Sequence, residues 1–230
     1  MGINGLHKGL TFCTKKSNIR EFRGQSVAID CSSWLHRSVY SISEQYVENI
    51  ERGCLQNSSC VQVSSKYVTS RCRELMDLFG IRRIYLVMDG KRCPLKADTN
   101  QERERRRREN LEDARNFKHQ GRRDKAEEKY KSCIKIRDEF TAAVMKSVSH
   151  HFSQDRRVEL IWSPYEADAQ LAKLCIDHVA DVVVTEVRSI VVFYFCSMRL
   201  PMTRLNTSNS SGFRCTCLFC RKPRFISGCL

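Results

Sequence analysis

The stretch Val27-Ala28-Ile29-Asp30 decides the fold class, because it is a short apolar run that leads directly into a carboxylate and the sequence repeats this arrangement. Three further runs end in the same way: residues 84–88 before Asp89, residues 160–162 shortly before Glu166 and Asp168, and residues 182–185 before Glu186. Short β-branched runs separated by long helical stretches indicate parallel strands. We therefore expect an α/β fold with a mostly parallel central sheet flanked by helices.

The acids that follow these strands predict a metal site. Ligands of open α/β sheets gather at the carboxyl ends of the strands, so acids placed there converge in space. Carboxylates without His or Cys suit a hard cation such as Mg²⁺ or Mn²⁺. A single acid after a strand is more often a turn residue or a helix N-cap, whereas four such acids together favour the metal site.

The segment Ser163-Pro164-Tyr165-Glu166 has a second interpretation as a capping box. In that case Ser163 is the N-cap residue of a helix, Pro164 its first residue and Glu166 the residue at N3. Asp168 would then only interact favourably with the helix dipole. The capping role and the metal-binding role are compatible, so both stay open.

The composition favours an anionic partner. Lysine and arginine total 40 against 26 acids, which gives a formal net charge of +14. Such a balance is typical of proteins that bind nucleic acid, although a basic surface that only keeps the protein soluble is the alternative. No apolar run approaches the length of a membrane span, so no membrane partner is expected. With no secretory signal visible, the 13 cysteines are expected to be reduced thiols.

The helical regions have two different characters. Helices are expected over residues 35–50 and 64–79, with a polar loop over 53–65 between them and Gly80 ending the second helix. Residues 96–149 are densely charged and helical. Charge runs of this kind usually form a solvated helix face with i,i+4 ion pairs. Because this run follows Asp89, phosphate binding is an equal alternative, since a polyanion that approaches carboxylates needs nearby cations.

Four motifs follow one another in an order known from one family of enzymes. They are Met1-Gly2-Ile3-Asn4-Gly5-Leu6, the strand 27–30 followed by Trp34-Leu35-His36, the turn Val87-Met88-Asp89-Gly90, and residues 164–172, Pro-Tyr-Glu-Ala-Asp-Ala-Gln-Leu-Ala. In these motifs the chain resembles the structure-specific 5′ nucleases of the flap endonuclease and XPG superfamily, most closely the exonuclease 1 branch. The resemblance covers residues 1 to 186.

The resemblance implies a PIN-like 5′ nuclease fold and a division of the chain. Residues 1–95 correspond to the XPG N-terminal nuclease region, residues 96–149 to a basic helical arch or gateway, and residues 150–186 to an incomplete internal nuclease region. Residues 187–230 form a non-homologous tail, which we expect to be poorly ordered.

The resemblance also implies the roles of individual residues. The ligands of the catalytic divalent ions are Asp30, Asp89, Glu166 and Asp168, which hold two Mg²⁺ ions in the family, with Mn²⁺ as a substitute. The catalytic cations are Lys96 and Arg103, whose spacing of two helical turns lets both side chains point the same way from one helix. The implied DNA contacts are Gly2, His36, Arg105, Arg106, Arg107 and Arg108.

A Mg²⁺-dependent 5′–3′ exonuclease or flap endonuclease is the function that the resemblance implies. Such an enzyme hydrolyses DNA phosphodiesters during repair or replication, and two metal ions can activate water and hold the leaving oxygen. The implied partners are DNA with 5′ ends, flaps, nicks or gaps, together with repair or replication proteins, and the implied location is the nucleus.

The chain departs from the family at the end of the last strand. The family reads Thr-Glu-Asp-Ser-Asp there, whereas this chain continues from Thr185-Glu186 with Val187, Arg188 and Ser189. Two metal-binding aspartates are therefore missing, so we do not expect a complete second metal site. Ser32 also stands where the exonuclease branch has a tyrosine, so a stacking platform for a base is missing. A catalytically impaired DNA-binding fragment and an unstable fragment are the alternatives to an active nuclease.

Residues 187–230 have a composition of their own, because none of the chain's acids lies there. Residues 190–195 form an apolar, aggregation-prone window. We expect this tail to come from a retained intron or a mis-joined gene model. Its cysteines, among them Cys215, Cys217 and Cys220, match no common four-ligand zinc pattern, so no zinc site is expected.

Overall fold

The computed structural model describes residues 14–91, 97–185, 202–205 and 217–220, which divide into two compact units. The first, which we call the sheet unit, is drawn from residues 1–31, 72–91 and 155–230. The second, the helical unit, is drawn from residues 32–71 and 92–154. In the described parts of the chain, no helix combines the length and apolar character needed to cross a membrane.

The sheet unit contains one sheet of seven strands in the order β1-β6-β7-β5-β2-β3-β4. The strands are β1 (Thr14–Ser17), β2 (Ser26–Asp30), β3 (Arg83–Met88), β4 (Val158–Trp162), β5 (Val182–Thr185), β6 (Met202–Leu205) and β7 (Cys217–Cys220). Four strands that follow one another in this order, β5, β2, β3 and β4, pair with one another in parallel, and β4 is the edge strand. They correspond to the four apolar runs, so the predicted α/β class with a parallel sheet is confirmed.

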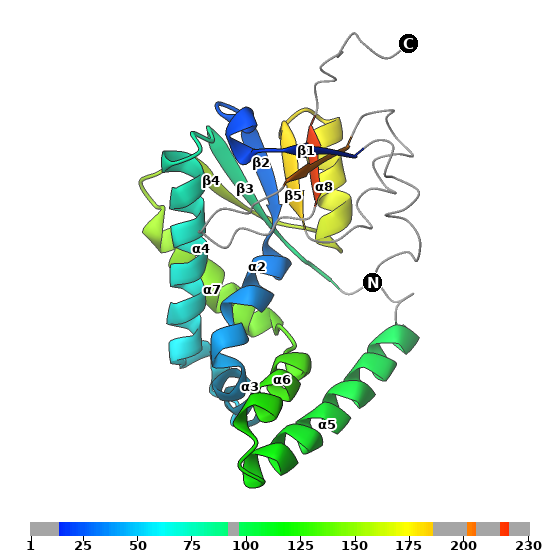
Figure 1. Ribbon diagram of the computed structural model, residues 1–230. Helices are drawn as coiled ribbons and strands as arrows, with labels where there is room; N and C mark the ends of the chain where they lie inside the picture. The colour runs from blue at the N-terminus through cyan, green and yellow to red at the C-terminus, as the bar shows by residue number, and fades with distance from the viewer. Residues whose placement is uncertain (1–13, 92–96, 186–201, 206–216, 221–230) are drawn as a thin grey trace. The chain divides into compact units, whose positions relative to one another are not determined.

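Burial explains why these runs form strands. β2 and β5 are buried along their whole length, and β3 is buried from Ile84 onward. Strands covered on both faces read as continuous Val, Ile and Leu runs rather than as an alternation. The helix α8 (Ala167–Ile176) contacts β2, β3 and β5, and Figure 1 shows it next to β5. The short 3-10 helix η2 (Ile19–Phe22) precedes β2 and buries Ile19 and Phe22.

The amino ends of β2 and β5 are joined by side-chain hydrogen bonds. Asp181 accepts from the backbone N–H of Ser26 at 2.9 Å and from its hydroxyl at 2.7 Å. In return, the backbone N–H of Asp181 donates to the backbone carbonyl of Ser26 at 3.0 Å. This clamp fixes the register of two central strands at the edge opposite their carboxyl ends.

The tail contributes two short strands to the sheet. β7 pairs antiparallel with β5 and with β6, and β6 pairs parallel with β1. The window 190–195 lies outside the described residues, and the predicted poor order of the tail stays a prediction.

The helical unit is built from helices of very different composition. They are α2 (Cys31–Ser38), η3 (Tyr40–Ile42), α3 (Ser43–Glu51), η4 (Leu55–Asn57), α4 (Ser59–Asp77), α5 (Ala97–His119), α6 (Arg123–Cys133) and α7 (Asp138–His151), with the start of α2 and the end of α4 counted in the sheet unit. The predicted helical character of residues 96–149 is confirmed for the described part. Tyr46 and Phe140 form the aromatic centre of the helical unit, since both are fully buried and their rings pack edge to face with centroids 5.0 Å apart.

Two predicted helix boundaries were wrong. The expected helix 35–50 is divided at Val39, and the hydroxyl of Ser38 forms hydrogen bonds with the backbone carbonyl of Leu35 and with the hydroxyl of Ser64. A serine that bonds to the preceding turn competes with helix continuation. The expected loop 53–65 is shorter, because α4 already begins at Ser59. The burial of Leu55 and of Ser64 explains why this serine-rich stretch is ordered rather than an extended polar loop.

Candidate active site

Asp30 is the last residue of β2, at the centre of the parallel sheet. Asp30 is only 3% exposed, although its side chain is a carboxylate. In the register of the sheet it lies opposite Val87 of β3, one residue before the end of that strand. Asp30 therefore lies at the same edge of the sheet, the one formed by the carboxyl ends of the strands, as the turn that follows β3.

The turn after β3 lies directly against the loop after β4. The backbone N–H of Gly90 donates to the carbonyl of Tyr165 at 2.5 Å, and that of Lys91 donates to the carbonyl of Pro164 at 3.2 Å. A Cβ atom at Gly90 would collide with the carbonyl oxygen of Ser163 and would lie 2.9 Å from carbonyl atoms of Pro164. Only glycine permits this approach, which brings the acid after β3 next to the acids after β4.

Asp89 caps the helix that carries the other two acids. Its Oδ1 accepts a hydrogen bond of 2.8 Å from the backbone N–H of Ala167, the first residue of α8. Glu166 is the N-cap residue in an extended conformation, and its own side chain makes no capping bond. Asp168 lies in the first turn of α8. The helix N-terminus thus joins Asp89, Glu166 and Asp168 in one local structure.

The predicted capping box was therefore wrong. Ser163 is not the N-cap residue, and its buried hydroxyl has no hydrogen-bond partner among the described residues. The acceptor for the first backbone N–H of the helix, that of Ala167, is instead Asp89, which lies 78 positions before Ala167 in the sequence. No local sequence signal could have identified it, because the contact depends on the pairing of β3 with β4.

The thiol of Cys31 is affected by the charges of both Asp30 and Asp89. It is fully buried, and burial raises its pKa well above the usual range. The neighbouring Cys72 raises the pKa further, followed by the negative charges of Asp30 and Asp89. Both carboxylates therefore act on one thiol, which places them on the same side of the sheet edge.

The donor set of this edge is made of carboxylates. Asp30, Asp89, Glu166 and Asp168 lie at or after the carboxyl ends of three neighbouring parallel strands, and oxygen donors of this type suit a hard cation. Over residues 14–91 and 97–185 and the two tail strands, however, no three His, Cys, Asp or Glu side chains form a group that could hold a metal ion. The chemistry of the donors fits a metal, and Asp89 is engaged with the helix N-terminus. The assignment of the four as ligands stays a prediction.

The predicted basic residues of α5 form ion pairs along their own helix. Arg105 and Arg106 both bond to Glu102, and Arg105 also pairs with Glu109. These hydrogen bonds lower the pKa of Glu102 to about 2. The interpretation as a solvated helix face therefore applies to these arginines.

Arg107 has a different environment from its neighbours. Its side chain is only 25% exposed and lies 3.5 Å from Glu104, a residue that also pairs with Lys135 at 2.5 Å. Burial lowers the pKa of Arg107, and the positive charge of Arg103 acts in the same direction. Neither Arg103 nor Arg108 has a carboxylate partner within the described part of the chain, so these two cations are the more available for an anion.

The remaining predicted residues are only partly described. His36 lies half-buried on α2 in the helical unit. Gly2 and Lys96 lie outside the described residues, and α5 is described from Ala97. The expectation that Lys96 and Arg103 project from one helix face therefore stays a prediction.

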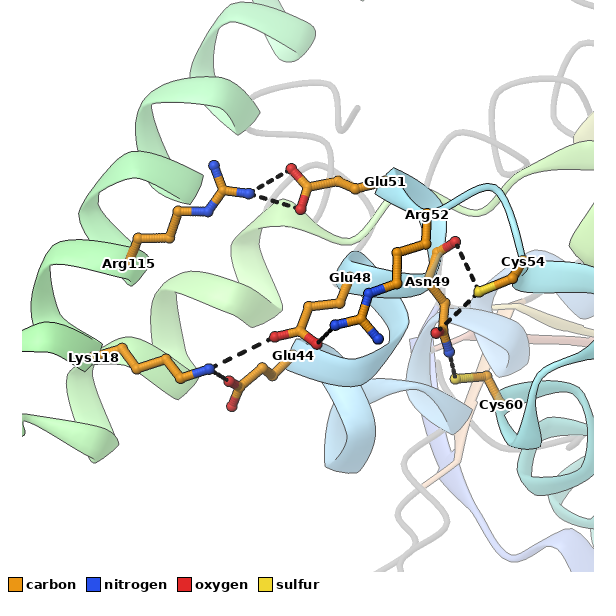
Figure 2. Close-up of polar contacts among 9 residues, drawn as sticks. All are labelled: Glu44, Glu48, Asn49, Glu51, Arg52, Cys54, Cys60, Arg115 and Lys118. Atoms are coloured by element: carbon orange, nitrogen blue, oxygen red, sulfur yellow. Dashed lines mark hydrogen bonds and ion pairs between the residues drawn. The ribbon is translucent and has the colours of Figure 1, made fainter.

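An ionic contact between α3 and α5 was not predicted. Figure 2 shows Arg115 bonded to both carboxylate oxygens of Glu51, at 2.6 and 2.7 Å, and Lys118 paired with Glu44 and Glu48. Glu44, Glu48 and Glu51 are spaced so that they share one face of α3, but no sequence signal assigned the arginine and lysine of α5 to them. On the same helix, Asn49 bonds to the thiols of Cys54 and Cys60.

The chain is similar to known nucleases in sequence and in fold. The XPG N-terminal domain model matches residues 1–110. Exonuclease 1 of Danio rerio is 29% identical over 196 residues, a match that covers 84% of this chain and 22% of that protein. Exodeoxyribonuclease 1 of Schizosaccharomyces pombe is 28% identical over 195 residues, covering 84% of this chain and 31% of that protein. The chain thus spans less than a third of the length of these relatives.

Solved structures show the same fold. The catalytic core of Rad2 in complex with DNA substrate matches with a TM-score of 0.56 and 18% identity, over 95% of this chain and 53% of that chain. Human GEN1 in complex with Holliday junction DNA matches with a TM-score of 0.53 and 15% identity, over 95% of this chain and 44% of that chain. The chain is therefore similar in sequence to the XPG nucleases, in particular to exonuclease 1, and it shares the fold of Rad2 and GEN1.

Proposed function

We propose that the chain is the catalytic part of a metal-dependent, structure-specific 5′ nuclease that hydrolyses DNA phosphodiesters. The observation that carries the proposal is the docking of the Asp89-Gly90 turn on residues 163–165, which brings acids from separate strands to one sheet edge. The relatives named exonuclease 1 and the fold shared with Rad2, solved with a DNA substrate, support the same activity.

Mg²⁺ is the ion that we propose for this edge. When bound, it supplies an activated water and offsets the negative charge that accumulates on the phosphate. Asp30 and Asp89 would hold it from the central strands, and Glu166 and Asp168 would do so from the start of α8. Mn²⁺ has the same preference for oxygen ligands and would serve as a substitute.

The cations of α5 would contact the phosphates of the substrate. Arg103, with Lys96, would stabilise the negative charge of the scissile phosphate. Arg105 and Arg106 are already paired with Glu102, so a phosphate that binds them must compete with that carboxylate. We propose DNA with 5′ ends, flaps, nicks or gaps as the substrate, repair or replication proteins as partners, and the nucleus as the location.

A DNA-binding role without catalysis is the second candidate. Val187 and Ser189 stand where the family has two metal-binding aspartates, which favours a chain that binds DNA but cuts it poorly. This candidate predicts that DNA affinity survives while Mg²⁺ has no effect on the DNA.

The decisive experiment is cleavage of labelled 5′-flap and recessed-end duplex DNA by the purified chain in Mg²⁺, with EDTA as a control. The matched variant is Asp89→Asn, which keeps an oxygen acceptor for Ala167 but removes the charge. We expect cleavage in Mg²⁺ and none in EDTA or with the variant. DNA binding by the wild-type chain without cleavage would contradict the nuclease proposal and support the second candidate.

A further inference from the structure

Two large aromatic side chains are exposed next to the candidate carboxylates. Trp162, the last residue of β4, is 49% exposed, and Tyr165, which directly precedes Glu166, is 58% exposed. The other exposed large hydrophobic residues that the structure describes are Tyr40, Val63, Leu78 and Val179. Single exposed apolar residues need no explanation, but two aromatic residues within four positions at a candidate active site indicate a binding surface.

The backbone beneath the Tyr165 ring is fixed. The carbonyl of Tyr165 accepts from Gly90 at 2.5 Å, and the carbonyl of Pro164 accepts from Lys91 at 3.2 Å. Pro164 also restricts its own backbone torsion. The ring therefore projects into solvent from a rigid support, so a ligand that stacks on it orders little of the protein chain.

Lys91 adds a positive charge to the segment that carries this ring. The backbone N–H of Lys91 is hydrogen-bonded to the carbonyl of Pro164, and Lys91 is exposed. No carboxylate partner for its ammonium group lies within the described part of the chain. An aromatic face next to a cation is the combination that binds a single-stranded nucleotide, because the ring stacks on the base and the cation contacts the phosphate. A neutral apolar ligand would not use the lysine.

We propose that Tyr165 and Lys91, together with Trp162, form a stacking site for a base of the single-stranded 5′ end of DNA. The site rests on the proposed nuclease function, and it would supply the stacking platform that the chain lacks at Ser32. Its place directly before Glu166 would position the adjoining phosphodiester at the carboxylate edge.

The test uses the full chain with Asp89→Asn as the parent, in Mg²⁺, and a 5′-flap DNA with 2-aminopurine in its single-stranded end. Stacking on an aromatic ring quenches this fluorescent base. We expect quenching on binding, its loss in Tyr165→Ala with an affinity about 5- to 150-fold lower, and its retention in Tyr165→Phe. Lys91→Ala should weaken binding and reduce its dependence on salt.

Leu78→Ala is the matched control, since Leu78 is 69% exposed but lies before β3, at the opposite edge of the sheet. It should bind and quench like the parent. Binding with no change in Tyr165→Ala, or an equal loss in Leu78→Ala, would overturn the stacking site and leave the nuclease proposal intact. Absence of DNA binding by both the parent and the wild-type chain would overturn the nuclease proposal and the stacking site together.

Discussion

Gly90→Ala is the substitution that tests how the active-site edge is assembled. An added Cβ meets the backbone carbonyls of Ser163 and Pro164, which cannot move like the end of a flexible side chain. Relief of the clash must separate the two loops and break the hydrogen bonds from Gly90 and Lys91. Two lost hydrogen bonds and the displaced backbone should together lower the free energy of unfolding by about 2–4 kcal/mol.

Urea unfolding followed by circular dichroism measures this loss, and flap cleavage measures its effect on the site. Gly53→Ala is the control, because Gly53 has a left-handed backbone with φ of +67° but nothing within 4 Å of an added Cβ. It should cost about 1 kcal/mol from backbone strain alone and leave cleavage unchanged. The reasoning would be refuted if Gly90→Ala destabilised the chain less than Gly53→Ala or cleaved DNA at the wild-type rate.

Three further predictions concern stability away from this edge. Asp181→Ala removes the acceptor of two hydrogen bonds from Ser26 and should lower the free energy of unfolding by about 1–3 kcal/mol in urea titrations. Arg115→Ala breaks an exposed ion pair with Glu51 and should cost less than about 1 kcal/mol, with no difference from wild type at high salt. The pKa of Glu102 is about 2 against an ordinary value of 4.5, so its contribution to α5 is fully present above pH 4.5 and is lost as the pH falls through 2. Helicity from circular dichroism should therefore decrease in that window, and Glu102→Gln should remove that part of the change.

The strands β2, β3 and β5 could be predicted from the sequence because burial along the strand leaves a simple signal. Runs such as residues 182–185 contain only residues that suit a buried strand, and in the sequence each run leads into a polar residue. The position of Asp30 and Asp89 at one edge follows from parallel pairing alone.

The finer structure of the site could not be predicted, because it depends on contacts between distant segments. Residues 163–166 satisfied every local rule for a capping box. In the structure, however, the pairing of β3 with β4 places the carboxylate of Asp89 at the N-terminus of α8, where it accepts the hydrogen bond of the helix. The division of the first helix at Val39 likewise depends on Ser38 meeting Ser64 of another helix. The pairing of α5 with α3 requires both helices to be placed first.

The interpretation of the arginine run shows the same limit. Sequence spacing correctly indicated ion pairs within α5, such as Arg106 with Glu102. It did not show that Arg107 is half-buried beside Lys135, since that environment is created by the segment after α6. Local charge patterns therefore predicted which residues could pair, but not which cations stay available for DNA.

Binding of Mn²⁺, followed by electron paramagnetic resonance, tests most directly whether the four carboxylates form a metal site. The variants are Asp30→Asn, which preserves the shape of a buried side chain, and Asp181→Asn, which makes the same charge change at the opposite edge. We predict stoichiometric uptake of Mn²⁺ by the wild-type chain and by Asp181→Asn, and its loss in Asp30→Asn. Absence of uptake by the wild-type chain, or uptake that Asp30→Asn leaves unchanged, would contradict the metal-dependent nuclease.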